Sequence, residues 1–199
     1  MRRLVLSIIL GLTLVPLASA AGTSPLQQRL VDAGEITGYT PLAAHTFGLA
    51  GYARAAGLDP DARAKLAHAG LIQAAVENLR APTTLPKEAN GPSQSSVVEF
   101  GSSRQAAAFA GWLRRAYYGG GGKLSAGVHQ TSLAIPGEPH ALGLHIWGQT
   151  KQGRLDEYNA ILVQGRYLDE IDVYTKGNRL TLQGAKNEFA AHFERLGNG

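Results

Sequence analysis

Histidine side chains are the first candidates for acid–base or metal chemistry in this sequence. The chain has no HExxH or comparable metal-binding pattern. The five-residue spacing of His140 and His145 would put these two rings on opposite faces of one strand. We therefore expect no metal site and no cofactor. The six histidines are His45, His68, His129, His140, His145 and His192.

Carboxylates gather in two places near the C-terminal end, at Asp156-Glu157 and at Asp169-Glu170-Asp172. In a strand, Glu170 and Asp172 share one face because side chains alternate with a period of two. A paired carboxylate site of the glycosidase type would need such neighbours. A solvated sheet face explains the same pattern, and we favour it.

Nucleophilic and phosphate-binding motifs fail on spacing. The sequence has no GxSxG elbow, and Ser102 or Ser103 is in the right place to cap a helix. In the GGGGK run, Tyr117 stands where a phosphate loop needs its first glycine, and Leu124 follows Lys123 where Ser or Thr is required. Cysteine is absent, which excludes disulfides, thiolate metal ligands and a Cys nucleophile. We predict no catalytic residue.

An aromatic and polar cluster is the best candidate for a binding site. In the run 141–148 (ALGLHIWG), alternation puts His145 and Trp147 on one face of a strand. Tyr158 and Tyr174 lie in the next two β-rich runs and could join them. On a sheet face free of helices, these four residues would suit a sugar, a lipid headgroup or a partner protein. The alternative is that the rings pack under the N-terminal helices or the long loop.

The elements that would position this cluster are β-rich. Four short strands between Gln130 and Tyr174 are joined by tight turns and should pair antiparallel. A helix beginning at Ser102 or Ser103 and one over 180–196 each carry an apolar face. We predict an α+β fold, in which an antiparallel sheet is packed with helices like an α/β/α sandwich and the C-terminal helix lies on the sheet.

The first half of the chain is less regular. Asp59-Pro60 begins a helix as cap and first helical residue, and Gly70 ends it. Residues 71–80 alternate like a strand but also suit a helix, so both assignments stay open. The other expected elements are a brief strand at 35–40, a helix at 46–57, a loop at 81–92 and a strand at 95–100.

The N-terminus predicts export. Arg2 and Arg3 precede the mostly apolar run 4–17, and Ala18-Ser19-Ala20 offers small residues for cleavage after Ala20. The apolar run is shorter than the roughly 20 residues that a membrane anchor needs. We therefore expect a cleaved Sec-type signal peptide (1–20), a flexible leader (21–29) and a single domain (30–199). The product would be periplasmic or extracellular, with no stable membrane span.

The charge balance argues against a nucleic-acid partner. The net charge is +4, from 19 Lys+Arg and 15 Asp+Glu. Removing Arg2 and Arg3 leaves 17 against 15, a balance of +2. A nucleic-acid-binding protein would need basic residues clustered on one face, and no such cluster is visible.

Two short motifs carry a resemblance to a known family. They are Val97-Val98-Glu99-Phe100-Gly101-Ser102, leading into an Ala-rich helix, and Gly165-Arg166-Tyr167, opening a strand before the final helix. In this order of elements the chain resembles the PsbP-like α/β/α sandwich and is similar to uncharacterised exported bacterial proteins. The resemblance implies a non-enzymatic binding or assembly module. It carries over no ligand-binding residue.

These observations favour an exported, non-catalytic module that binds a small ligand or an envelope partner protein. The alternative is an exported hydrolase with a non-standard site, in which His145 works with Asp156 or Asp172. That site needs the imidazole and the carboxylate within hydrogen-bond reach in a pocket. A third hypothesis is a structural factor that acts by oligomerisation.

Overall fold

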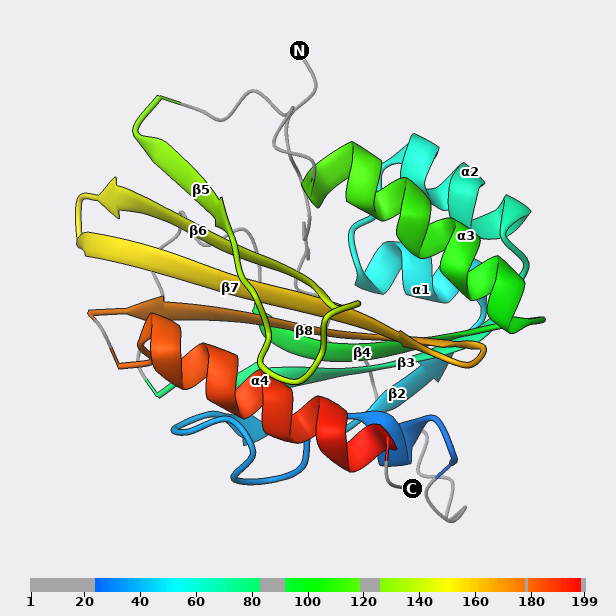
Figure 1. Ribbon diagram of the computed structural model, residues 1–199, viewed down its shortest axis with the longest axis horizontal. Coiled ribbons are helices and arrows are strands. Elements are labelled where there is room, and N and C mark those ends of the chain that lie inside the picture. Colours follow the sequence, from blue (N-terminus) through cyan, green and yellow to red (C-terminus); the bar gives the residue numbers. More distant parts are fainter. Residues whose placement is uncertain (1–23, 83–91, 119–125, 178, 198–199) are drawn as a thin grey trace.

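An eight-stranded sheet with helices on both faces forms the fold (Figure 1). The computed structural model describes residues 24–82, 92–118, 126–177 and 179–197. The strand order is β1-β3-β4-β8-β7-β6-β5, β2 also pairs with β3, and every pairing is antiparallel. The predicted α+β class is confirmed. The strands are β1 Thr40–Pro41, β2 His45–Phe47, β3 Leu71–Arg80, β4 Ser93–Phe100, β5 Val128–Ser132, β6 Leu142–Thr150, β7 Gly153–Gln164 and β8 Tyr167–Lys176.

The helices divide between the two faces. Helices α1, α2 and α3 cover one face, and α4 covers the other, as predicted for the C-terminal helix (Figure 1). The Asp59 carboxylate accepts a hydrogen bond of 2.7 Å from the Ala62 N–H, which confirms the predicted cap of α2. The helical elements are η1 Gln27–Arg29, α1 Leu49–Ala55, α2 Pro60–His68, α3 Ser103–Leu113, the π-helical turn η2 Arg114–Tyr118 and α4 Leu182–Gly197.

Pairing at the sheet edge decides the assignments that the sequence left open. Residues 71–80 form strand β3, whose centre is buried between β4 on one side and β1 and β2 on the other. The expected strand at 35–40 contributes only Thr40, which begins β1. The expected helix at 46–57 begins at Leu49, because His45–Phe47 is hydrogen-bonded to β3.

Each face of the sheet buries its own apolar cluster. Under α4, the fully buried Phe189 and Phe193 pack in a cluster with Ile171 and Val173 of β8. Under α1–α3, a second cluster includes Phe100, Phe109, Leu66 and Val98. The sheet is therefore the middle layer of three, and helices cover at least part of each of its faces.

The segment before residue 30 packs on the face that carries α4. Residues 21–29 are expected to form a flexible leader, but Leu26 is 1% exposed and packs with Leu30, Ala75 and Val97. Residues 24–29 thus belong to the folded domain. The predicted signal peptide, 1–20, lies outside the described residues. In the described part of the chain, no helix is long and apolar enough to cross a membrane.

Ion pairs and hydrogen bonds tie residues 28–35 to α4. Glu35 contacts His192 at 2.9 Å and Arg195 at 2.5 Å, and Arg195 also donates to the backbone carbonyls of Gln28 and Leu30. Burial raises the pKa of Glu35, but the hydrogen bonds from His192 and Arg195 outweigh it and lower the pKa to about 2. The carboxylate therefore stays ionised at any pH near neutrality.

Candidate functional site

The structure brings three of the four predicted binding residues together. A row of stacked rings crosses three strands, from His129 on β5 through Trp147 and His145 on β6 to Tyr158 on β7. Successive ring centroids are 5.4, 4.5 and 4.7 Å apart. His129 is exposed and Trp147 partly exposed, whereas His145 and Tyr158 are buried. The row lies on the face that carries α4.

Tyr174, the fourth predicted residue, lies on the opposite face. Tyr158 pairs with Val173 in the β7–β8 register, so the next residue along β8 points to the other side of the sheet. There Tyr174 stands opposite Glu157 and is 1% exposed. The site predicted from the sequence is thus divided between two faces.

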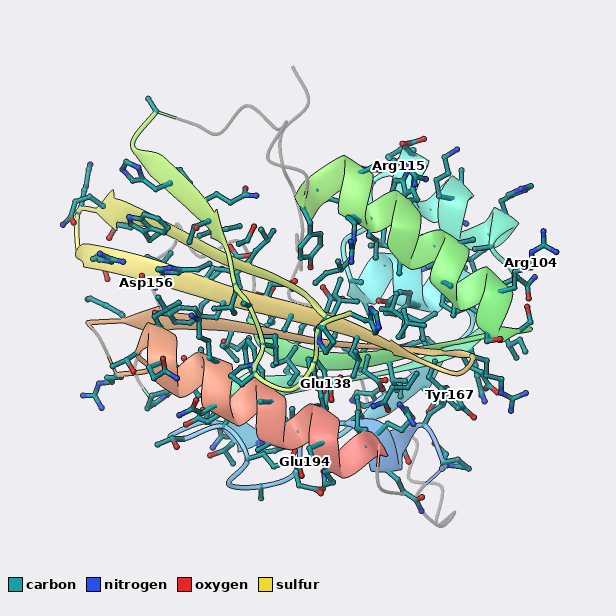
Figure 2. The ribbon with its side chains drawn as sticks, viewed as in Figure 1. Arg104, Arg115, Glu138, Asp156, Tyr167 and Glu194 are labelled. Carbon is teal, nitrogen blue, oxygen red and sulfur yellow. The ribbon has the colours of Figure 1, made fainter. Side chains whose placement is uncertain are left out.

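A histidine–carboxylate pair does form at the ring row. The Nε2 atom of His145 lies 2.7 Å from Oδ1 of Asp156, and Arg154 donates to both oxygens of that carboxylate. Burial raises the pKa of Asp156, but the hydrogen bonds from Arg154 and His145 outweigh it and lower the pKa. Asp172 points to the opposite face, so it cannot take this role. Figure 2 marks Asp156 on β7.

The other face holds a pocket that the sequence did not reveal. It lies between helices α1–α3 and the middle of the sheet, and its volume is about 50 Å³. Apolar and aromatic side chains dominate its lining, and polar groups lie on the sheet side. The lining residues are Tyr52, Ala56, Leu58, Asp59, Ala62, Leu66, Gln94, Val98, Phe109, Trp112, Leu113, Tyr117, Ile161, Leu168 and Glu170.

A hydrogen-bond network forms the polar floor of this pocket. Glu170 accepts from Asn159 Nδ2 at 2.9 Å and from Ser96 Oγ at 3.4 Å. The Tyr52 hydroxyl lies 3.5 Å from Ser96 Oγ, and the Tyr118 hydroxyl donates to Asn159. The network thus joins α1, η2 and three neighbouring strands.

Acidic groups gather beneath this floor. Burial raises the pKa of Glu170 despite its hydrogen bonds to Asn159 and Ser96. Burial, together with the charge of Glu170, raises the pKa of Glu157 to about 7. Burial is the main cause that raises the pKa of the Tyr118 hydroxyl, and the nearby charges of Glu170, Asp172 and Glu157 raise it further. The carboxyl groups of Glu157, Glu170 and Asp172 therefore all oppose ionisation of the same hydroxyl, that of Tyr118.

One polar atom at the pocket is unsatisfied. Gln94 is 3% exposed, and its Oε1 has no hydrogen-bond partner among the described residues. Leaving a buried acceptor unpaired costs about 1–3 kcal/mol. A cost of this size at a residue that lines a cavity is what a binding site for a polar group would show.

Aromatic rings form the wall opposite the floor. Trp112 stacks on Phe109 with ring centroids 5.4 Å apart and meets Tyr117 edge-on at 5.6 Å. The π-helical turn η2 follows α3 directly and carries both Tyr117 and Tyr118. Such turns are frequent at functional sites. One short segment therefore supplies part of the wall and one donor of the floor network.

The expectation of a solvated sheet face for Glu170 and Asp172 is wrong. Helices α1–α3 cover that face, and Asp172 is 0% exposed. The polar positions line up only once the strands are paired, because Ser96 stands opposite Glu170 and Gln94 opposite Asp172. In the described ranges, no three His, Asp or Glu side chains are arranged to hold a metal ion.

Comparison with known proteins identifies a related fold. No family model matches the chain, and no curated protein sequence matches it. Among solved structures, the chain is similar to the extracellular domain of PknH from Mycobacterium tuberculosis, with a TM-score of 0.56 and 13% identity. The match covers 88% of this chain and 97% of that domain. The two share a fold. The PsbP-like assignment stays a prediction.

Proposed function

We propose that this protein is an exported, non-catalytic module that binds a small ligand in the pocket between α1–α3 and the sheet. The observation that carries the proposal is the buried Oε1 of Gln94, which lines the pocket together with Glu170 and has no hydrogen-bond partner among the described residues. The fold shared with an extracellular domain and the predicted signal peptide support the export.

The composition of the pocket supports binding over simple core packing. Burying polar groups costs free energy unless they are paired, and an apolar core of the same shape is often as stable or more stable. Here three central strands place four polar side chains on the face that α1–α3 cover. They are Gln94, Ser96, Asn159 and Glu170. Small-ligand sites have this construction, in which an apolar cavity holds a few convergent polar groups.

The two tryptophans of the chain make the proposal directly testable. Trp112 lines the pocket and Trp147 belongs to the ring row. The variant Trp147→Phe keeps Trp112 as its sole tryptophan, and Trp112→Phe keeps Trp147. We expect at least one compound in a panel of small amines, alcohols, carboxylates and sugars to change Trp112 emission saturably in Trp147→Phe. The same compound should leave the emission of Trp112→Phe unchanged.

Two alanines of α2 provide the matched control. Ala62 lines the pocket, so Ala62→Leu should fill it and weaken binding at least tenfold. Ala64 is exposed on the same helix, and Ala64→Leu should leave binding unchanged. A response from Trp147 alone would move the site to the ring row, and equal binding by both alanine variants would also count against the pocket.

The contact between His145 and Asp156 favours a second candidate, the exported hydrolase. An imidazole oriented by a carboxylate can act as general base, which contributes about 10²–10⁴-fold in rate. Such an enzyme should release 4-nitrophenolate from 4-nitrophenyl acetate, and His145→Gln should slow this about 10²-fold. Equal rates for the two proteins would remove this candidate.

A further inference from the structure

We propose that the pocket selects a small organic cation, of the primary-amine class, whose charged group is bound at Glu170 and Gln94. The inference rests on the proposed function, because it names the ligand class of the same pocket. Four features carry it: the charges of the lining, the partners of Glu170, the acceptors on the pocket floor, and the size and composition of the walls.

The charged groups of the lining all have one sign. Asp59 and Glu170 are the ionisable acids among the lining residues, and the described lining contains no Lys, Arg or His. Arg104 and Arg115 belong to the same helical layer but are exposed and point away from the sheet (Figure 2). A cavity lined by one sign of charge and walled by apolar groups raises the local concentration of the opposite ion.

Glu170 differs from Asp169 and Asp156, two buried carboxylates on the other face of the sheet. There Asp169 pairs with Arg29 at 2.6 Å, and Asp156 pairs with Arg154 at 2.7 Å. Among the described residues, the partners of Glu170 are the neutral Asn159 and Ser96. A bound cation would give Glu170 the positively charged partner that those two carboxylates already have.

The hydrogen-bonding inventory favours an ammonium group over a hydroxyl. An ammonium offers three donors and no acceptor, whereas a hydroxyl offers one donor. The free Oε1 of Gln94 and the carboxylate of Glu170 are both acceptors on the pocket floor. Hydrogen bonds from a charged donor to a carboxylate are roughly twice as strong as neutral ones.

The walls set the size of the ligand and add attraction for a cation. The pocket is small, with a volume of about 50 Å³, which favours a compact ligand such as a short alkylamine. The aromatic residues Tyr52, Trp112 and Tyr117 line the cavity, and the faces of aromatic rings attract cations.

Three probes of nearly equal size isolate the effect of charge. Butylammonium, 1-butanol and butyrate should be titrated into Trp147→Phe at constant ionic strength and pH 7.5, with Trp112 emission as the readout. We expect butylammonium to bind with a dissociation constant at least tenfold lower than that of 1-butanol. Butyrate should not bind at the same concentrations.

The variant Glu170→Gln tests the residue that the inference names. It keeps the shape and removes the charge, so the preference for butylammonium should fall at least tenfold while 1-butanol affinity changes less than twofold. The control is Glu99→Gln, which neutralises a buried carboxylate on the other face and should keep the preference. Both variants should be compared by circular dichroism before titration.

Each outcome decides the inference. Equal affinity for 1-butanol and butylammonium would overturn the cation and leave the ligand pocket standing. If no probe binds, the inference is overturned as well, and the fragment panel then decides the proposed function separately. If Glu170→Gln does not fold, the ratio of the two dissociation constants in the Trp147→Phe protein is decisive by itself.

Discussion

Replacing Arg29 with Met should lower the free energy of unfolding by about 3–5 kcal/mol, the usual effect of removing one partner of a buried ion pair. Asp169 is 1% exposed and accepts from Arg29 at 2.9 and 2.6 Å, one bond to each carboxylate oxygen. Burial raises the pKa of Asp169 even with the guanidinium in place. Without it, a charged carboxylate would remain buried and uncompensated. Urea denaturation at pH 7 measures the loss.

Two further proteins make this result specific. Arg54→Met removes an exposed arginine of α1 and should change the stability by less than about 0.5 kcal/mol. The double variant Arg29→Met/Asp169→Leu removes both charges and should recover most of the loss, because no unpaired carboxylate is left. A loss below about 1 kcal/mol in Arg29→Met alone would show that the Arg29–Asp169 pair contributes little to stability.

Phe189→Ala should also cost about 3–5 kcal/mol of unfolding free energy, the range for truncating a buried aromatic side chain. Phe189 is 0% exposed and lies in the apolar cluster between α4 and the sheet. The truncation leaves a cavity that close-packed neighbours on the rigid sheet fill only in part. Thermal and urea unfolding of the two proteins measure the effect.

Leu182 supplies the control for this second result. It begins the same helix but is 38% exposed, so Leu182→Ala should cost less than about 1 kcal/mol. If both substitutions had similar effects, α4 would not be held to the sheet by the Phe189 cluster. The assignment of α4 as the cover of this face would then be wrong.

Local signals were sufficient to predict much of the fold. The period-two alternation of 141–174 predicts three strands that β6, β7 and β8 confirm, and Asp59-Pro60 predicts the start of α2. These predictions succeed because alternation and capping depend on residues near in sequence. Residues 71–80 stayed ambiguous because their strand is fixed by pairing with β4, a strand that comes later in the chain.

The candidate site could not be predicted in the same way. Whether Glu170 is solvated or buried depends on α1–α3, which precede it by 50 residues or more in the chain. Whether Tyr174 joins Tyr158 depends on register, because a shift of one residue exchanges the faces of a strand. Both are long-range properties. The sequence did identify His145 and Asp156 as a possible pair, and the structure places them in contact.

The joining of the N-terminal segment to α4 also determines how the domain could be presented at a surface. Gln28 and Arg195 are in direct contact through a 3.0 Å hydrogen bond, so the first and last segments that the structure describes lie beside each other on the face that α4 covers. A tether attached before Ser24 or after Gly197 would hold the domain from that side. The layer formed by α1–α3 would then point outward, and a ligand could approach the pocket without passing the point of attachment.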